Sequence, residues 1–233
     1  MDADSRLKAV IFDCDGILVD TEPLHYQAFQ VVLAPLGLGH DYDHYMEYYI
    51  GFDDRDAFRE AFREAGRCLD EATLTRLMRA KAEALLEIVS KGVASFPGVS
   101  ALVEELVKHG VPLAVASGAL RHEVLTFMEA LGLREAFPLI VAADDVSRSK
   151  PDPETYLVAL ERVREKLGTD SLDPSACIAI EDTPAGIQSA KAAGMYVVGV
   201  TNSFPADQLK DADQVVESLD QVSYGKMIQW LEK

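Results

Sequence analysis

Two aspartates, Asp13 and Asp15, directly follow a run of four apolar residues, 9–12. Side chains along an extended chain alternate between opposite sides, so both carboxylates face one side and Cys14 faces the other. Gly16 then lets the backbone turn away from the strand. Two carboxylates this close repel each other unless a cation, a shared proton or a reaction uses them. The spacing leaves two interpretations open, a functional acid pair or the polar start of a loop.

Later apolar runs also end in polar residues with complementary chemistry. These residues are Ser117 with Gly118, Lys150 a few residues beyond the third run, and Glu181 with Asp182. Ligands of parallel α/β sheets bind at the carboxyl ends of the strands, so we expect all of them along one edge. Up to four carboxylates against one lysine favour a divalent cation, and all-oxygen ligands suit Mg²⁺. A hydroxyl, a backbone amide and an ammonium group suit phosphate oxygens, so the set predicts a phosphoryl-transfer site.

The elements that carry these residues are apolar runs without alternation, as in strands covered on both faces. The runs are residues 9–12, 113–116, 139–143, 177–180 and 196–200. Helical periodicity separates them, and the pairs Asp152-Pro153 and Thr183-Pro184 are typical of helix starts. Strands that alternate with helices predict an α/β fold with a doubly wound, Rossmann-like parallel sheet.

One long segment lacks strand signals. Residues 23–92 contain apolar side chains at helical spacing and no convincing buried strand. We therefore predict a core domain formed by residues 1–18 and 96–233, and a helical domain, residues 19–95, inserted after the first strand.

Composition narrows the class of protein. The chain has 233 residues, 48% hydrophobic and 26% charged, with 22 basic against 39 acidic side chains and a net charge of −17. This balance argues against nucleic acid or an anionic membrane as the main partner.

The N-terminal residues do not resemble a signal peptide, and no apolar stretch is long enough to span a membrane. Three widely spaced cysteines are typical of reduced thiols, so we expect a cytoplasmic protein. We also expect it to be a monomer or weak dimer.

Four segments together carry a family resemblance. They read DCDGILVDTE at residues 13–22, ASG at 116–118, SKPDP at 149–153 and IEDTPAGI at 180–187. In this order they resemble the four motifs of the haloacid dehalogenase superfamily, and the similarity is closest to β-phosphoglucomutase-like phosphatases and mutases. The helical insert resembles the small helical cap domain of that branch.

The resemblance implies roles for the core residues. Asp13 would be the nucleophile that forms an aspartyl-phosphate. Asp15 would protonate the leaving oxygen and then take a proton from the group that accepts the phosphoryl. Ser117, Gly118 and Lys150 would hold the phosphate, and Lys150 would also balance the charge of Asp13.

The resemblance also implies a Mg²⁺ cofactor. Its ligands would be Asp13, the backbone carbonyl of Asp15, and Asp182, with Glu181 acting directly or through water. In the cap domain, His25, Thr21 and Lys81 match positions that couple cap closure to acid catalysis and substrate binding.

Two further positions concern the substrate. Arg55 could correspond to an arginine of the branch that binds a second phosphate, although its spacing is shifted. The mutase has a lysine where Leu120 stands, so either Arg121 compensates or the substrate differs.

The first functional hypothesis is a Mg²⁺-dependent phosphatase for a small phosphorylated metabolite, a sugar phosphate. The alternative is a sugar-phosphate mutase, in which a sugar hydroxyl instead of water takes the phosphoryl group, and the motifs leave this choice open. A signalling receiver module also combines acids, a hydroxyl and a lysine on a doubly wound sheet. The helical insert and the second acid, Asp15, argue against it.

Overall fold

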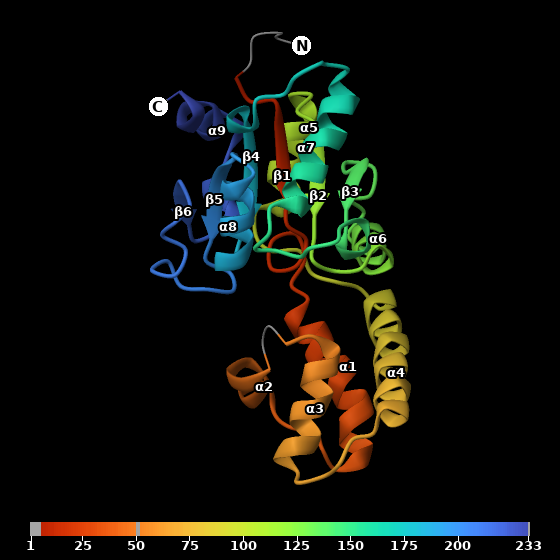
Figure 1. The fold of residues 1–233 in the computed structure, drawn as a ribbon. Helices are drawn as coiled ribbons and strands as arrows, with labels where there is room; N and C mark the ends of the chain where they lie inside the picture. The colour runs from red at the N-terminus through yellow and green to blue at the C-terminus, as the bar shows by residue number, and fades with distance from the viewer. Residues whose placement is uncertain (1–5, 50–51, 233) are drawn as a thin grey trace. The chain divides into compact units, whose positions relative to one another are not determined.

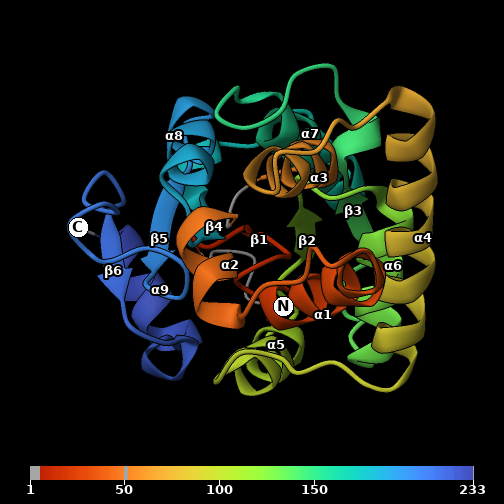
Figure 2. The ribbon, with the colours of Figure 1, turned by 90° about the horizontal axis from the view of Figure 1, so that it is seen from below.

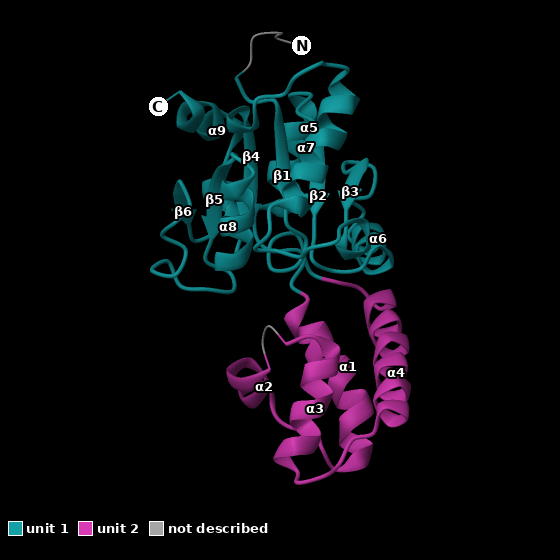
Figure 3. Ribbon diagram, in the orientation of Figure 1, with its two compact units in different colours: residues 1–20, 94–233 teal, residues 21–93 magenta. Residues whose placement is uncertain are grey.

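The computed structural model describes residues 6–49 and 52–232, shown as a ribbon in Figure 1. The N-terminal residues 1–5, on which the signal-peptide expectation rests, lie outside the described residues. The chain divides into two compact units, residues 1–20 with 94–233 and residues 21–93 (Figure 3). Each junction lies two residues from the predicted domain boundary, because an antiparallel bridge between Val19 and Ser95 holds both connecting segments with the first unit.

The first unit is built on a six-stranded sheet with the order β3-β2-β1-β4-β5-β6, and every neighbouring pair is parallel. The strands are β1 (Ala9–Phe12), β2 (Leu113–Ala116), β3 (Leu139–Val141), β4 (Cys177–Glu181), β5 (Tyr196–Val200) and β6 (Gln214–Val216). This confirms the predicted doubly wound parallel sheet. The sixth strand was not predicted, because β6 is a half-buried edge strand of three residues without a continuous apolar run.

Helices cover both faces of this sheet. They are α5 (Val99–Lys108), α6 (Arg121–Ala130), α7 (Glu154–Leu167), α8 (Pro184–Ala192) and α9 (Tyr224–Leu231). Figure 2 shows α5 and α9 on one face and α7 and α8 on the other. The apolar stripe of α7, which includes Ala159 and Val163, joins the core beside β2 and β3. The sheet is therefore enclosed, and β1 at its centre is completely buried.

The helices next to the predicted motifs begin at polar caps. Thr183 Oγ1 accepts a hydrogen bond from the Gly186 amide at 3.0 Å, which confirms the predicted start of α8. Helix α7 begins at Glu154, one residue later than predicted, where Asp152 Oδ1 accepts a hydrogen bond from the Glu154 amide at 3.0 Å. The cap of α8 directly follows Asp182, and the cap of α7 lies two residues after Lys150.

The second unit is helical throughout its described residues. It contains α1 (Glu22–Leu33), η1 (Ala34–Leu36), α2 (Tyr42–Tyr48), α3 (Asp54–Glu64) and α4 (Glu71–Ser90). Its own apolar core includes Phe29, Phe58, Phe62 and Leu74. Among the described helices of either unit, none combines the length and apolar character that crossing a membrane requires.

Candidate active site

The site lies where the central strands end. Asp13 follows β1, Ser117 follows β2 and Glu181 closes β4, and β1 lies between the other two strands. The Asp13 amide donates to Ile180 O at 3.0 Å and the Ser117 amide donates to Val141 O at 2.9 Å. These backbone hydrogen bonds to neighbouring strands hold the main chain of both residues in place. As predicted from their positions after the strands, these residues meet at one edge of the sheet.

Asp13 is buried and its two carboxylate oxygens are in different surroundings. Oδ1 accepts a hydrogen bond from the Cys14 amide at 2.8 Å and lies 3.1 Å from Lys150 Nζ. Oδ2 accepts no hydrogen bond from the part of the chain that the structure describes. Burial raises the pKa of Asp13 well above its ordinary value, and Lys150 opposes this rise. One oxygen is thus held in place while the other remains available for chemistry.

Lys150 connects the acids of the site. Its ammonium group donates to Ala116 O at 2.9 Å and to Glu181 Oε1 at 2.6 Å, and it pairs with Asp13 Oδ1. An ammonium group has three protons, and these three acceptors match them. The contacts indicate that Lys150 balances the negative charge of Asp13. To bind a phosphate oxygen as well, the ammonium group would have to give up one of its three present acceptors.

Glu181 is fully buried and is held by four hydrogen bonds. Oε1 accepts from Lys150 and from the Tyr156 hydroxyl at 2.7 Å, whereas Oε2 accepts from the Asp182 amide and Thr183 Oγ1, each at 3.2 Å. Both oxygens are therefore occupied by the chain. This favours the water-mediated alternative for Glu181 over direct coordination of a metal.

Tyr156 is a site residue that the sequence pattern does not predict. Its side chain is fully buried on α7, and Lys150 Nζ lies 5.1 Å from the centre of its ring. An aromatic residue on the apolar stripe of a helix is ordinarily a core residue, so its pattern gave no functional signal.

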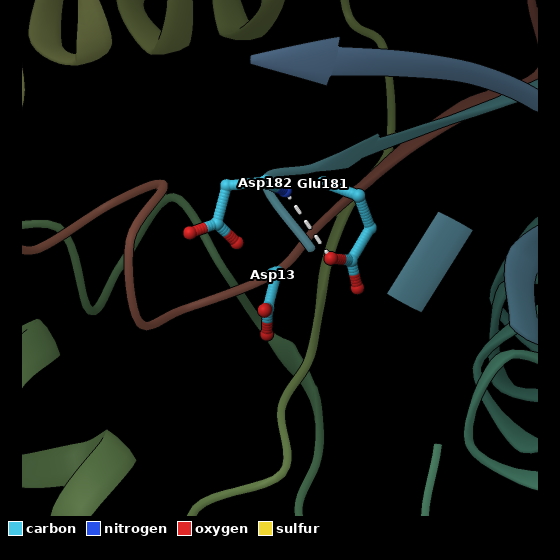
Figure 4. Close-up of side chains that lie close together, drawn as sticks. All are labelled: Asp13, Glu181 and Asp182. Carbon is cyan, nitrogen blue, oxygen red and sulfur yellow. Dashed lines mark hydrogen bonds between the residues drawn. The ribbon is translucent and has the colours of Figure 1, made fainter. Parts of the chain in front are cut away.

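Asp182 completes a cluster of three acids. Asp13, Glu181 and Asp182 each offer an oxygen within 4.8 Å of the other two, and Figure 4 shows the three side chains grouped at the strand ends. Asp182 Oδ2 accepts a hydrogen bond from Ser203, whereas Oδ1 is buried without a partner among the described residues. Burial, and then the charge of Glu181, raise the pKa of Asp182 to about 7. A buried, unpaired carboxylate oxygen in an all-oxygen cluster fits a hard divalent cation.

Asp15 and Ser117 lie together beside this cluster. Ser117 Oγ donates to Asp15 Oδ2 at 3.4 Å and accepts from the Ala119 amide at 2.9 Å. Gly118 is exposed, and a side chain there would meet nothing within 4 Å. The space around Gly118 therefore does not itself require glycine, and its substrate contact stays a prediction.

The contacts of Arg121 bear on whether it compensates for the lysine that the mutase has where Leu120 stands. Its guanidinium donates to Ile140 O at 2.8 Å and pairs with Asp145, which also binds Arg162 at 3.2 Å. Leu120 remains 46% exposed just before α6. Since Arg121 is already neutralised, the contacts favour a different substrate over compensation for the missing lysine.

The helical unit contains a hydrogen-bonded trio, His25, Asp54 and Lys81, of which Lys81 is buried and the other two are half-buried. Lys81 is 1% exposed, and its Nζ lies 2.6 Å from Asp54 Oδ1 and 2.7 Å from His25 Nδ1. An ammonium group can only donate, so His25 Nδ1 is the acceptor and Nε2 carries the proton. Burial, and then the charge of Lys81, lower the pKa of His25 to about 3, so the imidazole is neutral.

The other two predicted cap residues, Thr21 and Arg55, add no side-chain hydrogen bond to this trio among the described residues. Thr21 is buried just before α1, and its carbonyl accepts from the Leu24 and His25 amides. Arg55 is exposed and pairs with Glu71 at 3.0 Å. The substrate contacts of Thr21, Lys81 and Arg55, and the catalytic role of His25, stay predictions.

Comparisons with known proteins show the family to which the chain belongs. A model of the haloacid dehalogenase-like hydrolase family matches residues 10–200. Protein CbbY of Rhodobacter capsulatus is 34% identical over 226 residues, which cover 92% of this chain and 94% of the relative. The fructose-1-phosphate phosphatase YqaB of Escherichia coli is 35% identical over 200 residues, which cover 84% and 97%.

A solved structure shows the same fold. The crystal structure of β-phosphoglucomutase from Clostridium difficile matches with a TM-score of 0.78 at 23% identity, and the match covers 97% of each chain. The chain belongs to the haloacid dehalogenase-like hydrolases, which confirms the family resemblance.

Proposed function

We propose that the protein is a Mg²⁺-dependent phosphatase that hydrolyses a small sugar phosphate through an aspartyl-phosphate on Asp13. The observation that carries this proposal is the buried Asp13 carboxylate, with one oxygen held by Lys150 and the other without a hydrogen bond from the described residues. It lies beside a second acid and an Asp182 oxygen that has no partner among the same residues. A relative that is 35% identical is a fructose-1-phosphate phosphatase, which supports a sugar phosphate as substrate.

The chemistry uses two acids in sequence. Asp13 Oδ2 attacks phosphorus in line, a bond forms between this oxygen and phosphorus, and the bond from phosphorus to the ester oxygen breaks. Asp15 gives its proton to the departing oxygen and then takes a proton from the water that attacks the aspartyl-phosphate. In this second step the water oxygen bonds to phosphorus, the bond between phosphorus and Asp13 Oδ2 breaks, and phosphate leaves with the Asp13 carboxylate restored. Ser117 orients the Asp15 carboxylate, and Lys150 keeps a positive charge at the nucleophile.

Asp13, Asp182 and the Asp15 carbonyl would hold Mg²⁺, with Glu181 supporting them through its fixed carboxylate. Bound there, the cation would neutralise charge on the phosphoryl oxygens. The chain itself supplies the nucleophile, the proton transfer and the orientation of both.

Replacing Asp15 by Ala is expected to lower kcat about a hundredfold to ten-thousandfold, the usual range for a positioned acid or base. Steady-state assays with a sugar phosphate measure this loss. The leaving oxygen of p-nitrophenyl phosphate departs with little need for protonation. The rate at which Asp13 is phosphorylated by this ester is therefore expected to fall less in Asp15→Ala than the rate with the sugar phosphate. Unimpaired hydrolysis of the sugar phosphate by Asp15→Ala would remove this role for Asp15.

Mg²⁺ binding is expected to weaken about tenfold between pH 8 and pH 6, because a proton competes for Asp182, whose pKa is raised to about 7. Without metal, the pKa of Asp182 is higher in the folded protein than in the unfolded chain. Protonation of Asp182 therefore stabilises the metal-free fold at low pH, and this contribution is lost as pH rises through about 7. Thermal unfolding with and without Mg²⁺ at both pH values measures the effect, with NaCl of equal ionic strength as control. A Mg²⁺-induced rise in Tm that is larger at pH 6 would contradict it.

The test of the function itself is incubation with a hexose 1-phosphate and Mg²⁺. Release of free phosphate, with the sugar left unphosphorylated, is expected for a phosphatase. Conversion to hexose 6-phosphate without free phosphate would identify a mutase and overturn the proposal. A screen of phosphorylated metabolites then identifies the preferred sugar.

We also propose that the enzyme acts in the cytoplasm on a small molecule, as a monomer or weak dimer, rather than on nucleic acid or a membrane. All three cysteines are free, with Cys14 and Cys177 buried and Cys68 exposed. Free thiols and a net charge of −17 support this setting.

A further inference from the structure

The segment that follows β5 reaches the acid cluster, although it lies outside the four motifs. Asn202 Nδ2 donates a hydrogen bond to Gly16 O at 2.7 Å, and Ser203 Oγ donates to Asp182 Oδ2. One residue therefore holds the loop after β1, and its neighbour holds an acid after β4. The two contacts join three strand ends at the sheet edge.

The Ser203 bond decides how the Asp182 carboxylate is turned. A carboxylate is planar, so fixing Oδ2 also fixes the direction of Oδ1, the oxygen that is buried without a partner among the described residues. Gly16 closes off the side next to Oδ2, where a Cβ would lie 1.9 Å from Asp182 Oδ2 and 3.0 Å from Ser203 Oγ. Ser203 and Gly16 therefore restrict Asp182 to one orientation.

We propose that Ser203 is a positioning residue for the cation, which holds Asp182 so that Oδ1 faces the metal. This inference rests on the proposed function, because it takes Asp182 as a Mg²⁺ ligand. Hydrogen-bond partners of metal ligands typically change metal affinity by about tenfold to a hundredfold when they are removed. Asn202 assists by fixing the Gly16 carbonyl, next to the predicted Asp15 ligand.

The test measures metal binding directly. Mg²⁺ alone is titrated by calorimetry, and Mn²⁺ alone by electron paramagnetic resonance, into the wild-type chain, Ser203→Ala and Ser203→Thr. Ser203→Ala is expected to raise the Kd for both ions about tenfold to a hundredfold. Ser203→Thr keeps the hydroxyl and is expected to bind within a few-fold of wild type.

Ser223→Ala is the matched control. Ser223 is a half-buried serine whose hydroxyl caps α9. This variant is expected to keep the wild-type Kd, whereas a loss equal to that of Ser203→Ala would overturn the positioning role. If Ser203→Ala does not fold, Ser203→Cys keeps the side-chain shape with only a weak donor and is expected to weaken binding.

The outcomes separate the inference from the proposed function. Wild-type affinity in a folded Ser203→Ala or Ser203→Cys variant would overturn the role of Ser203 alone. Absence of Mg²⁺ binding by the wild-type chain, or equal binding by Asp182→Asn, would instead overturn the metal site on which the inference rests.

Discussion

Asp13→Asn is expected to lower kcat by a factor on the order of 10⁴ or more and to abolish covalent phosphorylation. The amide is nearly the same size as the carboxylate, so the site keeps its shape. It lacks the negative oxygen that attacks phosphorus, and no other step in the mechanism can replace that bond. Steady-state phosphate release, measured with saturating Mg²⁺ and sugar phosphate, checks the rate.

Stability measurements separate this chemical loss from misfolding. Burial, and then the charges of Glu181, Asp182 and Asp15, raise the pKa of Asp13 although Lys150 opposes the rise, so the neutral side chain is favoured in the metal-free fold. The metal-free Asp13→Asn variant is therefore expected to unfold at or above the wild-type temperature. Asp144→Asn is the matched control, because Asp144 is an exposed acid close after β3, and it is expected to keep full activity. Turnover by Asp13→Asn within tenfold of wild type would contradict the role of Asp13.

Lys150→Met is expected to destabilise the fold by about 3–5 kcal/mol, the usual cost of removing one partner from a buried ion pair. The Lys150 side chain is 10% exposed and its partners, Asp13 and Glu181, are 10% and 0% exposed. Without the lysine, the cluster retains only negative charges. Burial alone would lower the pKa of Lys150, but Asp13 and Glu181 raise it, so the ammonium stays charged across the assay range.

Lys191→Met is the matched control for this prediction. Lys191 also pairs with an aspartate, Asp213, at 2.7 Å, but the two side chains are 39% and 27% exposed. The expected cost there is at most about 1 kcal/mol, because solvent screens the pair. Urea unfolding of both variants without metal measures the difference. An equal cost in the two variants would show that Lys150 does not compensate the buried acids.

The core strands could be predicted because each is a continuous apolar run. β1, β2, β4 and β5 are almost completely buried, and burial on both faces is what such runs indicate. β6 could not be predicted in this way, because its three residues are only half-buried at the edge of the sheet. Its pairing with β5 depends on the assembled sheet and not on a local pattern.

The same distinction applies to the site. Asp13, Lys150 and Asp182 were predictable because polar residues after buried strands must lie at one edge. Tyr156 and Ser203 were not, because each acts through a hydrogen bond to an acid 25 and 21 residues away in the sequence, respectively. Tyr156 lies on an apolar helix stripe and Ser203 in a loop, where these residue types are ordinary. Only the folded chain shows which acid each one contacts.

The central claim is that Asp13 carries the phosphoryl group during turnover. Rapid acid quench of the wild-type enzyme with Mg²⁺ and a sugar phosphate, followed by peptide mass spectrometry, tests it directly. A single added phosphoryl group on the peptide that contains Asp13, lost in alkali and absent from Asp13→Asn, is predicted. Rapid turnover with no phosphorylated peptide at any quench time, or with the phosphoryl group on another residue, would contradict it.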